Sequence, residues 1–280
     1  MTKASWQDFG THDESAFPEL WDGVVGAWAP CLGPTGSRLH DMSRRSNWGA
    51  ATGMTLATDW QLQSGQYGIQ TSTSSKYVEC RPVPIEGTTD FTVSLWVNVA
   101  TTQTAANNLV PLFGQKTPNA SDAGFMVVYF YAGGNAGKWL MSTGSGATFS
   151  EPLTSGTANV TGTIAHVVMR RGAGLAQNGD FVINGIRYPL ATTLTILNIT
   201  TTTNMTWGRD ATGFRQTNQV IFEATCWRRC LHINEIAELY RIGVGGMYQR
   251  RRRRAIYLPQ AGFQAAWALR RSQIIGGGLR

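Results

Sequence analysis

The sequence predicts an all-β protein, an antiparallel sandwich of two sheets that ends in one short helix and an extended basic tail. Segments between residues 77 and 227 alternate apolar and polar residues with the period of a half-buried strand. Gly, Asn, Thr and Ser, which favour turns, are abundant between these segments. Apolar residues make up 42% of the chain and charged residues only 15%, which suits many strands with a weakly charged polar surface.

Four segments carry the strand pattern most clearly. Residues 91–99 (FTVSLWVNV) are apolar at every odd position, as a strand buried on one face requires. Residues 124–131 (GFMVVYFY) are apolar on both faces, which predicts a central strand. Residues 163–170 and 219–227 add two more strands. A hairpin is predicted at Asn184-Gly185, because both positions of a type I′ turn need positive φ.

One helix is predicted at the end of the sandwich. Four apolar residues recur at the spacing of one helix face: Ile233, Ile236, Ala237 and Tyr240. Glu235 and Glu238 lie near the helix start, where negative charge is favourable, and Gly243 is placed to end the helix. We expect this helix to lie across the sandwich.

The positive charge of the chain is concentrated in its last forty residues. Residues 241–280 contain nine arginines, five of them in the run from Arg250 to Arg254, and no Asp or Glu. The first 240 residues hold fifteen Lys and Arg against seventeen Asp and Glu, so the net charge of +7 comes from the tail. Guanidinium groups at this density repel one another, and we therefore expect the tail to dock on a partner.

Several kinds of partner fit the tail. Five adjacent arginines could contact DNA phosphates without sequence preference. A nuclear-localisation motif matches by pattern alone, and nothing else in the chain indicates a nucleus. We favour a protein partner, because apolar and aromatic residues interleave with the arginines, and these residue types are enriched at interface hot spots. The predicted docking residues are Tyr248, Arg250, Arg251, Arg252, Arg253, Arg254, Tyr257, Phe263, Trp267, Arg270 and Arg271.

The sequence argues against several other classes of protein. It shows no apolar run of secretory or membrane-spanning length, so we expect synthesis in a cytoplasm and no membrane contact. The four cysteines lack paired metal-binding spacing and are expected to be ordinary buried or partly buried thiols. No cofactor is expected, and calcium cannot be placed because no D-x-D-x-D-G loop occurs.

No catalytic constellation is visible either. Retaining glucanases need two carboxylates close together, and no Glu-x-Asp-x-Glu strand pattern is present. His166 lies within a predicted strand, where we expect it to pack in the sandwich rather than act as a base. The protein is therefore expected not to be an enzyme.

Several motifs resemble one known family. They are residues 21–49 (WDGVVGAWAPCLGPTGSRLHDMSRRSNWG), the strand at 90–99, HVVMRR at 166–171 with its hairpin, WGRD at 207–210, and the closing CWRRCL and EIAELY segments at 226–240. Together they resemble the concanavalin A-like, laminin-G-like lectin/glucanase domains over about residues 20–243. The resemblance implies a jelly-roll sandwich and does not specify an activity, because both lectins and glucanases use this fold.

The tail extends the resemblance. A domain of this family followed by an arginine run and a Gly-rich end is similar to proteins encoded beside the capsid and tail genes of tailed bacteriophages. The resemblance implies a non-enzymatic virion component in multiple copies, made in the host cytoplasm and docked on other virion proteins such as major capsid or tail proteins. We expect an N-terminal arm (1–19), a sandwich (20–246) and a docking tail (247–280). The alternatives are a free carbohydrate-binding module and, third, a glucanase-like hydrolase.

Weak glycan adhesion is also expected, because flat aromatic side chains can stack on sugar rings. Most of the ten tryptophans fall at positions where a sandwich needs bulk, such as Trp28, Trp96, Trp207 and Trp227. Trp139 follows the Gly-rich loop at 133–137 and is expected to be exposed. Trp139 and Asn135 are therefore the predicted glycan contacts.

Overall fold

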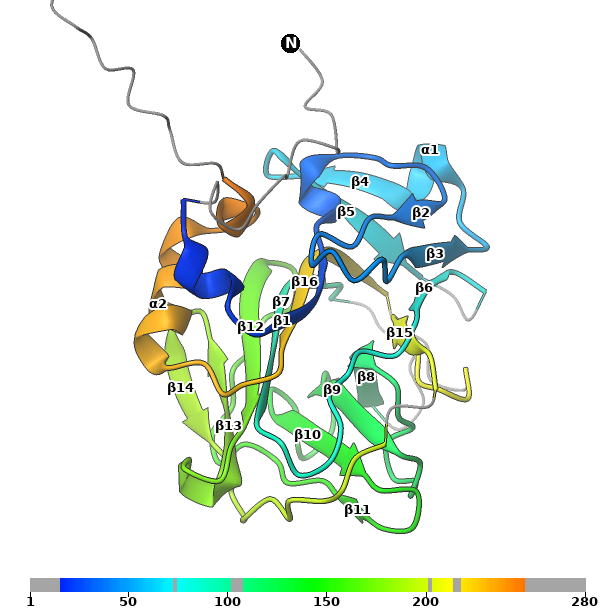
Figure 1. Cartoon of the computed structure of the whole chain (residues 1–280). Coiled ribbons are helices and arrows are strands. Elements are labelled where there is room, and N and C mark those ends of the chain that lie inside the picture. The colour runs from blue at the N-terminus through cyan, green and yellow to red at the C-terminus, as the bar shows by residue number, and fades with distance from the viewer. Residues whose placement is uncertain (1–15, 73–74, 102–107, 201–202, 214–217, 250–280) are drawn as a thin grey trace, which may run out of the picture. The chain divides into compact units, whose positions relative to one another are not determined.

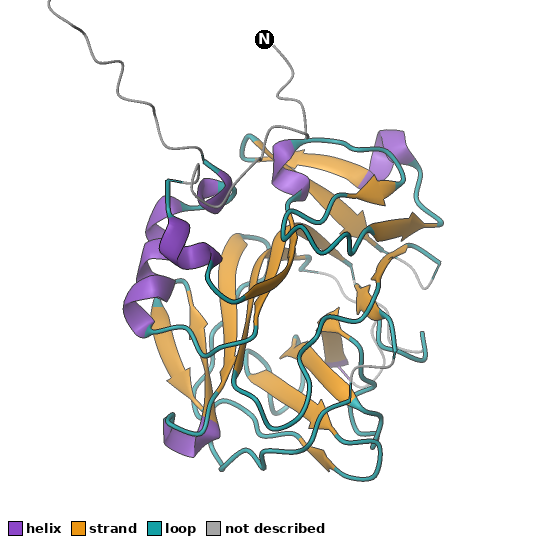
Figure 2. Cartoon of the chain, in the orientation of Figure 1, coloured by secondary structure: helices purple, strands orange, loops and turns teal. Residues whose placement is uncertain are grey.

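The computed structural model describes residues 16–72, 75–101, 108–200, 203–213 and 218–249. Within these residues, sixteen strands form two antiparallel sheets. Figure 1 follows the chain through both sheets, and Figure 2 shows how few helices accompany the strands. The predicted all-β jelly-roll sandwich of two antiparallel sheets is confirmed.

The first sheet is built around the long strands β7 and β16, which pair along their whole length. Its order is β14 (Ile186–Pro189), β13 (Gly179–Ile183), β12 (Ile164–Arg171), β7 (Phe91–Val99), β16 (Gln219–Trp227), β5 (Gln66–Thr71) and β4 (Trp60–Gln63). The other edge of β16 pairs with β5 at residues 219–221 and with β1 (Val24–Trp28) at residues 224–227.

The second sheet contains the remaining strands. Its order is β11 (Phe149–Ser150), β10 (Trp139–Gly144), β9 (Gly124–Phe130), β8 (Leu109–Gly114), β15 (Met205–Trp207), β6 (Tyr77–Cys80), β3 (Gly49–Thr52) and β2 (Arg38–Leu39). At one end of this sheet, β2 and β3 from the start of the chain lie beside β6. This end holds the candidate site.

The alternation of the sequence predicted the main strands accurately. The segment 91–99 is β7 and 219–227 is β16, while β9 ends one residue before the predicted boundary. The segment 163–170 becomes β12, displaced by one residue. Asn184 and Gly185 have φ of 50° and 80° and connect β13 to β14, which confirms the predicted turn.

The predicted helix is α2 (Ile233–Ile242), and Gly243 ends it with φ of 74°. At its start, the backbone N–H of His232 donates to Glu235 Oε2 (2.7 Å). The buried residues are Ile236 and Leu239, whereas Ile233 and Tyr240 are 37% and 42% exposed. The predicted buried face is therefore wrong in part. The residues that face the sheet are Ile236 and Leu239, three positions apart, and the prediction did not include Leu239. The other helices are single turns: η3 (Pro18–Trp21), η4 (Pro30–Leu32), α1 (Leu56–Asp59), η6 (Ala176–Asn178) and η7 (Gly246–Tyr248).

The main core lies between the two sheets and is rich in aromatic rings. Trp28 from the first sheet packs against Phe113 and Trp207 from the second, with ring centroids 6.0 Å from each. All three side chains are fully buried. Burial of such rings stabilises a sandwich strongly, because each removes a large apolar area from water. The expectation that most tryptophans serve as core bulk is confirmed for Trp28, Trp96, Trp207 and Trp227.

A second apolar cluster covers the outer side of the first sheet. Helix α2 lies beside β12 to β14 on the side away from the second sheet (Figure 1), and Ile236 and Leu239 pack on Val168 and Val182. Trp227 Nε1 donates to the carbonyl of Leu20 at 2.7 Å, which joins β16 to η3. Both faces of the first sheet are thus covered.

The domain boundaries differ from those expected. Met247 and Tyr248 are buried in the second cluster, with exposed fractions of 1% and 3%, and Trp21 Nε1 donates to the carbonyl of Met247 (3.3 Å). Phe17 also packs on this cluster, and the N–H of Ala16 donates to Gln249 O. Residues 16–19 and 247–249 therefore pack with the sandwich, and the prediction that the tail begins at residue 247 is corrected.

Two charged residues are buried as a pair on the outer side of the first sheet. Arg170 binds Asp180 with two hydrogen bonds of 2.7 and 2.5 Å and also donates to the carbonyl of Leu231. Arg187 reaches the same carboxylate from the surface at 2.5 Å.

Among the described residues, no helix is long and apolar enough to cross a bilayer.

Candidate functional site

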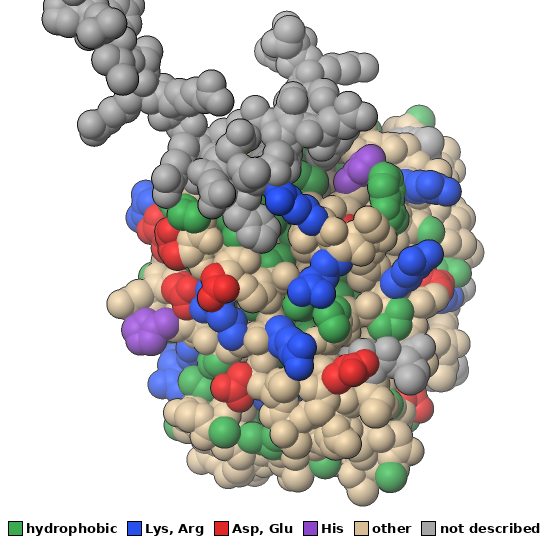
Figure 3. Space-filling model, in the orientation of Figure 1, with side chains coloured by type: hydrophobic (Ala, Val, Ile, Leu, Met, Phe, Trp, Pro, Cys, Tyr) green, Lys and Arg blue, Asp and Glu red, His purple; other side chains and the backbone are tan. Residues whose placement is uncertain are grey.

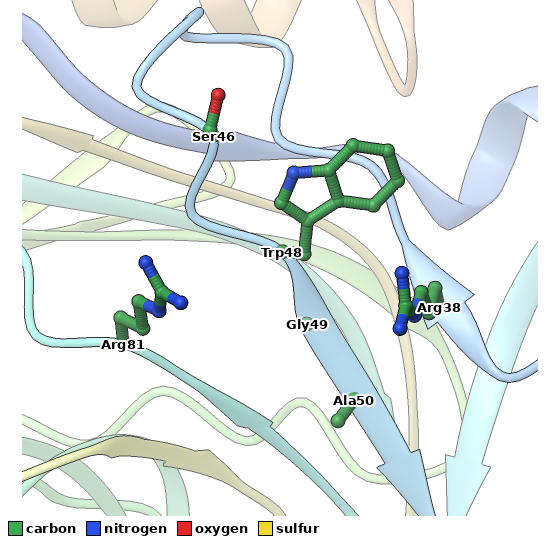
Figure 4. A pocket seen from close by; sticks show the side chains of 6 residues that line it. All are labelled: Arg38, Ser46, Trp48, Gly49, Ala50 and Arg81. Atoms are coloured by element: carbon green, nitrogen blue, oxygen red, sulfur yellow. The ribbon is translucent and has the colours of Figure 1, made fainter.

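A pocket of about 270 Å³ opens where β2, β3 and the chain after β6 meet. Six residues line it: Arg38, Ser46, Trp48, Gly49, Ala50 and Arg81. Arg38 comes from β2, Ser46 and Trp48 come from the loop before β3, and Arg81 follows β6. The pocket thus combines segments that are distant in the sequence (Figure 4).

Trp48 gives the pocket a large aromatic surface. Its side chain is 43% exposed, although most tryptophans of the domain lie in the cores. The ring contacts His40, with centroids 4.4 Å apart and planes tilted by 52°. Desolvation lowers the pKa of His40, so the imidazole beside the indole is neutral at pH 7. The indole therefore has neighbours that orient it and a face that remains open.

Arg38 and Arg81 lie on either side of Trp48 (Figure 4). Both side chains are exposed, and among the described residues neither guanidinium has a hydrogen bond or an ion pair. The six lining residues include no carboxylate. Figure 3 shows several basic side chains on this face of the molecule. The pocket therefore offers positive charge and hydrogen-bond donors on two sides of an aromatic ring.

The loop before β3 is held in place by Asp41. Its Oδ1 accepts hydrogen bonds from the N–H groups of Ala27 (3.1 Å) and Ser43 (2.9 Å). Its Oδ2 accepts from the Ser43 hydroxyl (2.8 Å) and from the N–H of Asn47 (3.0 Å). One carboxylate thus satisfies three backbone donors and a hydroxyl, which fixes the loop against β1.

Asn47 connects Trp48 to Arg81. Its side-chain Nδ2 donates to the carbonyl of Arg81 at 2.8 Å, and its own carbonyl accepts from Trp28 Nε1 at 2.7 Å. Asn47 is 5% exposed, and its bond with Trp28 is buried while its bond with Arg81 is partly buried. The side chain of Asn47 therefore ties the backbone of Arg81 to the residue that directly precedes Trp48.

Gly49 allows the strand to continue into the core directly after Trp48. A Cβ at this position would lie 2.9 Å from Val78 Cγ1 and 3.1 Å from both Cys80 Sγ and Leu39 Cβ. Only glycine fits this close approach of β3 to its neighbours, which leaves the preceding indole at the surface.

The predicted glycan contact at Trp139 is wrong. Trp139 is fully buried as the first residue of β10, where its ring packs against Tyr129 (4.9 Å) and Phe181 (5.8 Å). Its indole N–H donates to the carbonyl of Ala158. The Gly-rich loop before it gave no information on which face of the strand Trp139 would occupy. Asn135 is half-buried in that loop, and the structure does not bring it to the Trp48 pocket.

The predicted docking residues cannot be gathered into one site. Tyr248 is buried, and its hydroxyl lies 3.3 Å from Thr225 Oγ1, so it is not free to anchor a partner. The other predicted docking residues, from Arg250 to Arg271, lie outside the described residues.

Two buried titratable groups lie on the outer side of the first sheet. His166 Nε2 is 2.9 Å from Ser94 Oγ, and its ring stacks on Trp96 at 4.7 Å. Desolvation lowers the pKa of His166 to about 3, so it is a neutral packing residue as predicted. Glu223 is 3% exposed and accepts a hydrogen bond from the N–H of Gly245 (2.9 Å), and burial raises its pKa to about 7.

The cysteines and the acidic residues add no reactive or metal-binding cluster. All four cysteines are free, Cys80 and Cys226 are buried and Cys31 and Cys230 are partly buried, as predicted. Burial raises the pKa of the Cys80 and Cys226 thiols well above their usual range, which makes them unreactive. Across the described residues, no group of three His, Cys, Asp or Glu could hold a metal ion.

Comparison with known families agrees with this fold. The laminin-G-type family described as the concanavalin A-like lectin/glucanases superfamily matches residues 72–237, which is more than half of the chain. The chain belongs to this superfamily. The match is shorter than the expected range of about 20–243, and Arg81 is the one pocket residue inside it. A comparison with curated protein sequences finds no match.

Several solved structures share the fold. The binding domain of Paraclostridial Mosquitocidal Protein 1 is similar with a TM-score of 0.56 and 13% identity, over 79% of this chain and 52% of that one. The botulinum neurotoxin serotype G binding domain has a TM-score of 0.56 and 13% identity, over 78% and 51%. Trypanosoma rangeli sialidase has a TM-score of 0.52 and 15% identity, over 80% and 33%. The chain thus spans about half the length of these binding domains and a third of the sialidase chain. The chain is thus a domain of the concanavalin A-like lectin/glucanase superfamily that is similar in fold to these toxin binding domains.

Sequence reasoning missed the pocket. The segment RRSNWG at 44–49 is polar and basic around one tryptophan, and this signal could have indicated an exposed aromatic residue. Arg81 could not have been added from the sequence, because a hydrogen bond between residues 34 positions apart brings it to the loop.

Proposed function

We propose that the chain is a non-enzymatic recognition module whose sandwich binds a glycan at the Trp48 pocket. The observation that carries this proposal is the open face of Trp48 beside two arginines that have no ion pair among the described residues, on a loop that partly buried hydrogen bonds hold in place. The apolar face of a pyranose ring stacks on an indole, and neighbouring donors bind its oxygens. The lectin-type fold supports the proposal.

The chemistry of the pocket favours binding over catalysis. The six lining residues include no Asp, Glu, His or Cys, and hence no general acid, general base or carboxylate nucleophile. Glycoside hydrolysis uses a pair of carboxyl groups across the bond to be cleaved. A ligand in this pocket would therefore be held and not cleaved.

An immobilised panel of oligosaccharides tests the proposal. We expect the wild-type chain to bind a subset of the panel and the Trp48→Ala variant to lose that binding while keeping its thermal unfolding temperature. Phe149→Ala is the matched control, because Phe149 is a similarly exposed ring (48%) on the distant strand β11. Equal binding by the wild type and Trp48→Ala, or no binding to any glycan, would contradict the proposal.

We propose, second, that residues 250–280 dock this module on a bacteriophage virion, in several copies on capsid or tail proteins. The observation that favours docking is the composition of the segment, which carries eight arginines and no acid. Arg250 to Arg254, Tyr257, Phe263, Trp267, Arg270 and Arg271 remain the proposed anchors. Many copies would convert weak glycan contacts into useful adhesion.

Particle analysis tests the virion proposal independently of the glycan proposal. Particles from the source culture are purified on a density gradient, washed in high salt and quantified by mass spectrometry. We expect this chain at a fixed ratio to the major structural proteins after the wash. Absence from the particles would leave a free carbohydrate-binding module as the remaining proposal.

A further inference from the structure

We propose that the glycan bound at the Trp48 pocket carries an anionic group, a carboxylate or a sulfate, which Arg38 and Arg81 bind beside the indole ring. This inference rests on the glycan-binding function proposed above and specifies the class of ligand. It assigns a role to Arg38 and Arg81, whose exposed side chains do not take part in the packing of the fold.

The first argument is the balance of donors and acceptors in the pocket. Each guanidinium presents five N–H donors in a planar fork and no acceptor. Ser46 supplies the one side-chain hydroxyl among the six lining residues. A neutral sugar hydroxyl both donates and accepts, so sites for neutral sugars use amide and carboxylate groups. A pocket made almost entirely of donors fits a ligand made of acceptors, such as a carboxylate or a sulfate.

The second argument is the uncompensated charge. Several other basic residues of the domain have acidic partners: Arg229 binds Glu235 at 2.7 Å, and Lys116 binds Glu151 at 2.8 Å. Arg38 and Arg81 have no such partner among the described residues, although both line a pocket. Two like charges that face one cavity repel each other, and a bound anion removes that repulsion.

The third argument is the fixed spacing of the three side chains. Arg38 is paired with Ala50 across β2 and β3, and Ala50 is paired with Glu79 across β3 and β6. The backbone of Arg81, two residues after Glu79, is tied to Asn47. The backbones that carry both arginines are therefore set by the sheet and one buried amide, while the guanidinium ends can adjust to a ligand.

The arrangement also explains why a sugar is favoured over a free ion. Trp48 lies between the two guanidiniums (Figure 4), so a ligand that contacts both the ring and an arginine must present an apolar face and an anionic substituent together. A pyranose ring with an attached carboxylate or sulfate has this shape. A small inorganic ion would leave the indole uncovered.

Matched glycan pairs test the inference in the full-length chain. The carboxylate arm uses an oligogalacturonate and a sialylated oligosaccharide, each compared with its methyl ester. The sulfate arm uses a sulfated oligosaccharide and its desulfated form. We expect at least one anionic form to bind about tenfold or more tightly than its neutral partner, as for the loss of a charge-assisted hydrogen bond. The affinity is also expected to fall as NaCl rises, because the arginines are exposed.

Point variants assign the effect to the pocket. Arg38→Gln and Arg81→Gln should each reduce the preference for the anionic form by about tenfold while leaving binding of the neutral form unchanged. Arg228→Gln is the matched control, since Arg228 is an exposed arginine outside the pocket. The arginine tail is present in every variant, so its contribution cancels in these differences.

The outcomes separate this inference from the proposed function. Equal binding of anionic and neutral forms, lost in Trp48→Ala, would overturn the anionic ligand and leave glycan binding standing. Binding that is unchanged in Arg38→Gln and Arg81→Gln would overturn the assignment to these residues. A single-stranded oligodeoxythymidine that competes at equal affinity would show general polyanion binding and overturn the glycan class. No binding to any glycan would overturn both proposals.

Discussion

The wild-type protein should lose stability as the pH rises, and the replacement Glu223→Gln should remove that loss. Glu223 is buried on β16 with 3% of its surface exposed, and its Oε2 accepts a hydrogen bond of 2.9 Å from the N–H of Gly245. No cation pairs with it among the described residues. Desolvation therefore raises the pKa of Glu223 from 4.5 to about 7.

The magnitude follows from the difference between the two pKa values. Between pH 4.5 and about 7 the unfolded chain has lost the proton of Glu223 while the folded chain keeps it. Since the folded state binds more protons in this window, the free energy of unfolding falls as the pH rises. The shift from 4.5 to about 7 corresponds to about 3 kcal/mol of stability, which is fully present below pH 4.5 and is lost as the pH rises to about 7 and above.

Urea unfolding at a series of pH values from 4 to 8 measures this effect. The glutamine amide is close in shape to the protonated acid and retains an acceptor for the Gly245 N–H, but it does not titrate. We expect the stability of Glu223→Gln relative to wild type to rise by about 3 kcal/mol between pH 4 and pH 8. The contribution of His166 is the same in both proteins and cancels in the difference.

Glu19→Gln, the same replacement at an exposed position, controls for the loss of one negative charge. If Glu223→Gln and wild type show parallel stability profiles across the whole pH range, Glu223 does not titrate abnormally. Its environment would then be wetter than the packing around β16 and η7 indicates.

Three further predictions concern stability. His166→Phe should remove a loss of stability that the wild type shows as the pH falls below 6.5, because the unfolded chain gains a proton that the buried imidazole, with its pKa lowered to about 3, does not bind; unfolding at pH 4 and pH 7 should show about 3 kcal/mol of this loss in the wild type and none of it in the variant. Asp180→Ala should cost about 3–5 kcal/mol by leaving a buried guanidinium unpaired, whereas Arg187→Ala should cost less than about 1 kcal/mol because that side chain is 44% exposed, and denaturant titration compares them. Truncation after Gln249 should leave the unfolding temperature of the sandwich unchanged, whereas truncation after Gly246 should cost about 3 kcal/mol or more because it removes two buried side chains, and an equal effect of both cuts would place the tail in the core.

The strands could be predicted because their pattern is local. In β7 and β16 the pattern of apolar residues marks the strands, and the observed bounds equal the predicted ones, although both strands are buried on both faces. The Asn184-Gly185 turn was equally accessible, since its positive φ values restrict the residue types. These elements depend on neighbours in the sequence, so the sequence contains the information for them.

The site could not be predicted because it depends on contacts across the fold. Trp139 and Trp48 both follow a polar, turn-rich stretch, yet Trp139 is buried and Trp48 is 43% exposed. The difference arises from the position of Trp139 on the inner face of β10 and from the clamp that Asp41 imposes on the loop at 40–48. Neither the face of a short strand nor a clamp to another segment can be read from the adjacent residues.

The most direct test of the account observes Trp48 while a ligand binds. The indole N–H signals of isotopically labelled tryptophan in the full-length chain are followed by NMR during titration with a glycan that the panel identifies, and Trp48→Phe assigns the signal. We expect the Trp48 signal to shift with saturation while the signal of the buried Trp139 stays in place. A saturable shift at another tryptophan with no change at Trp48 would place the glycan elsewhere and contradict the proposed site.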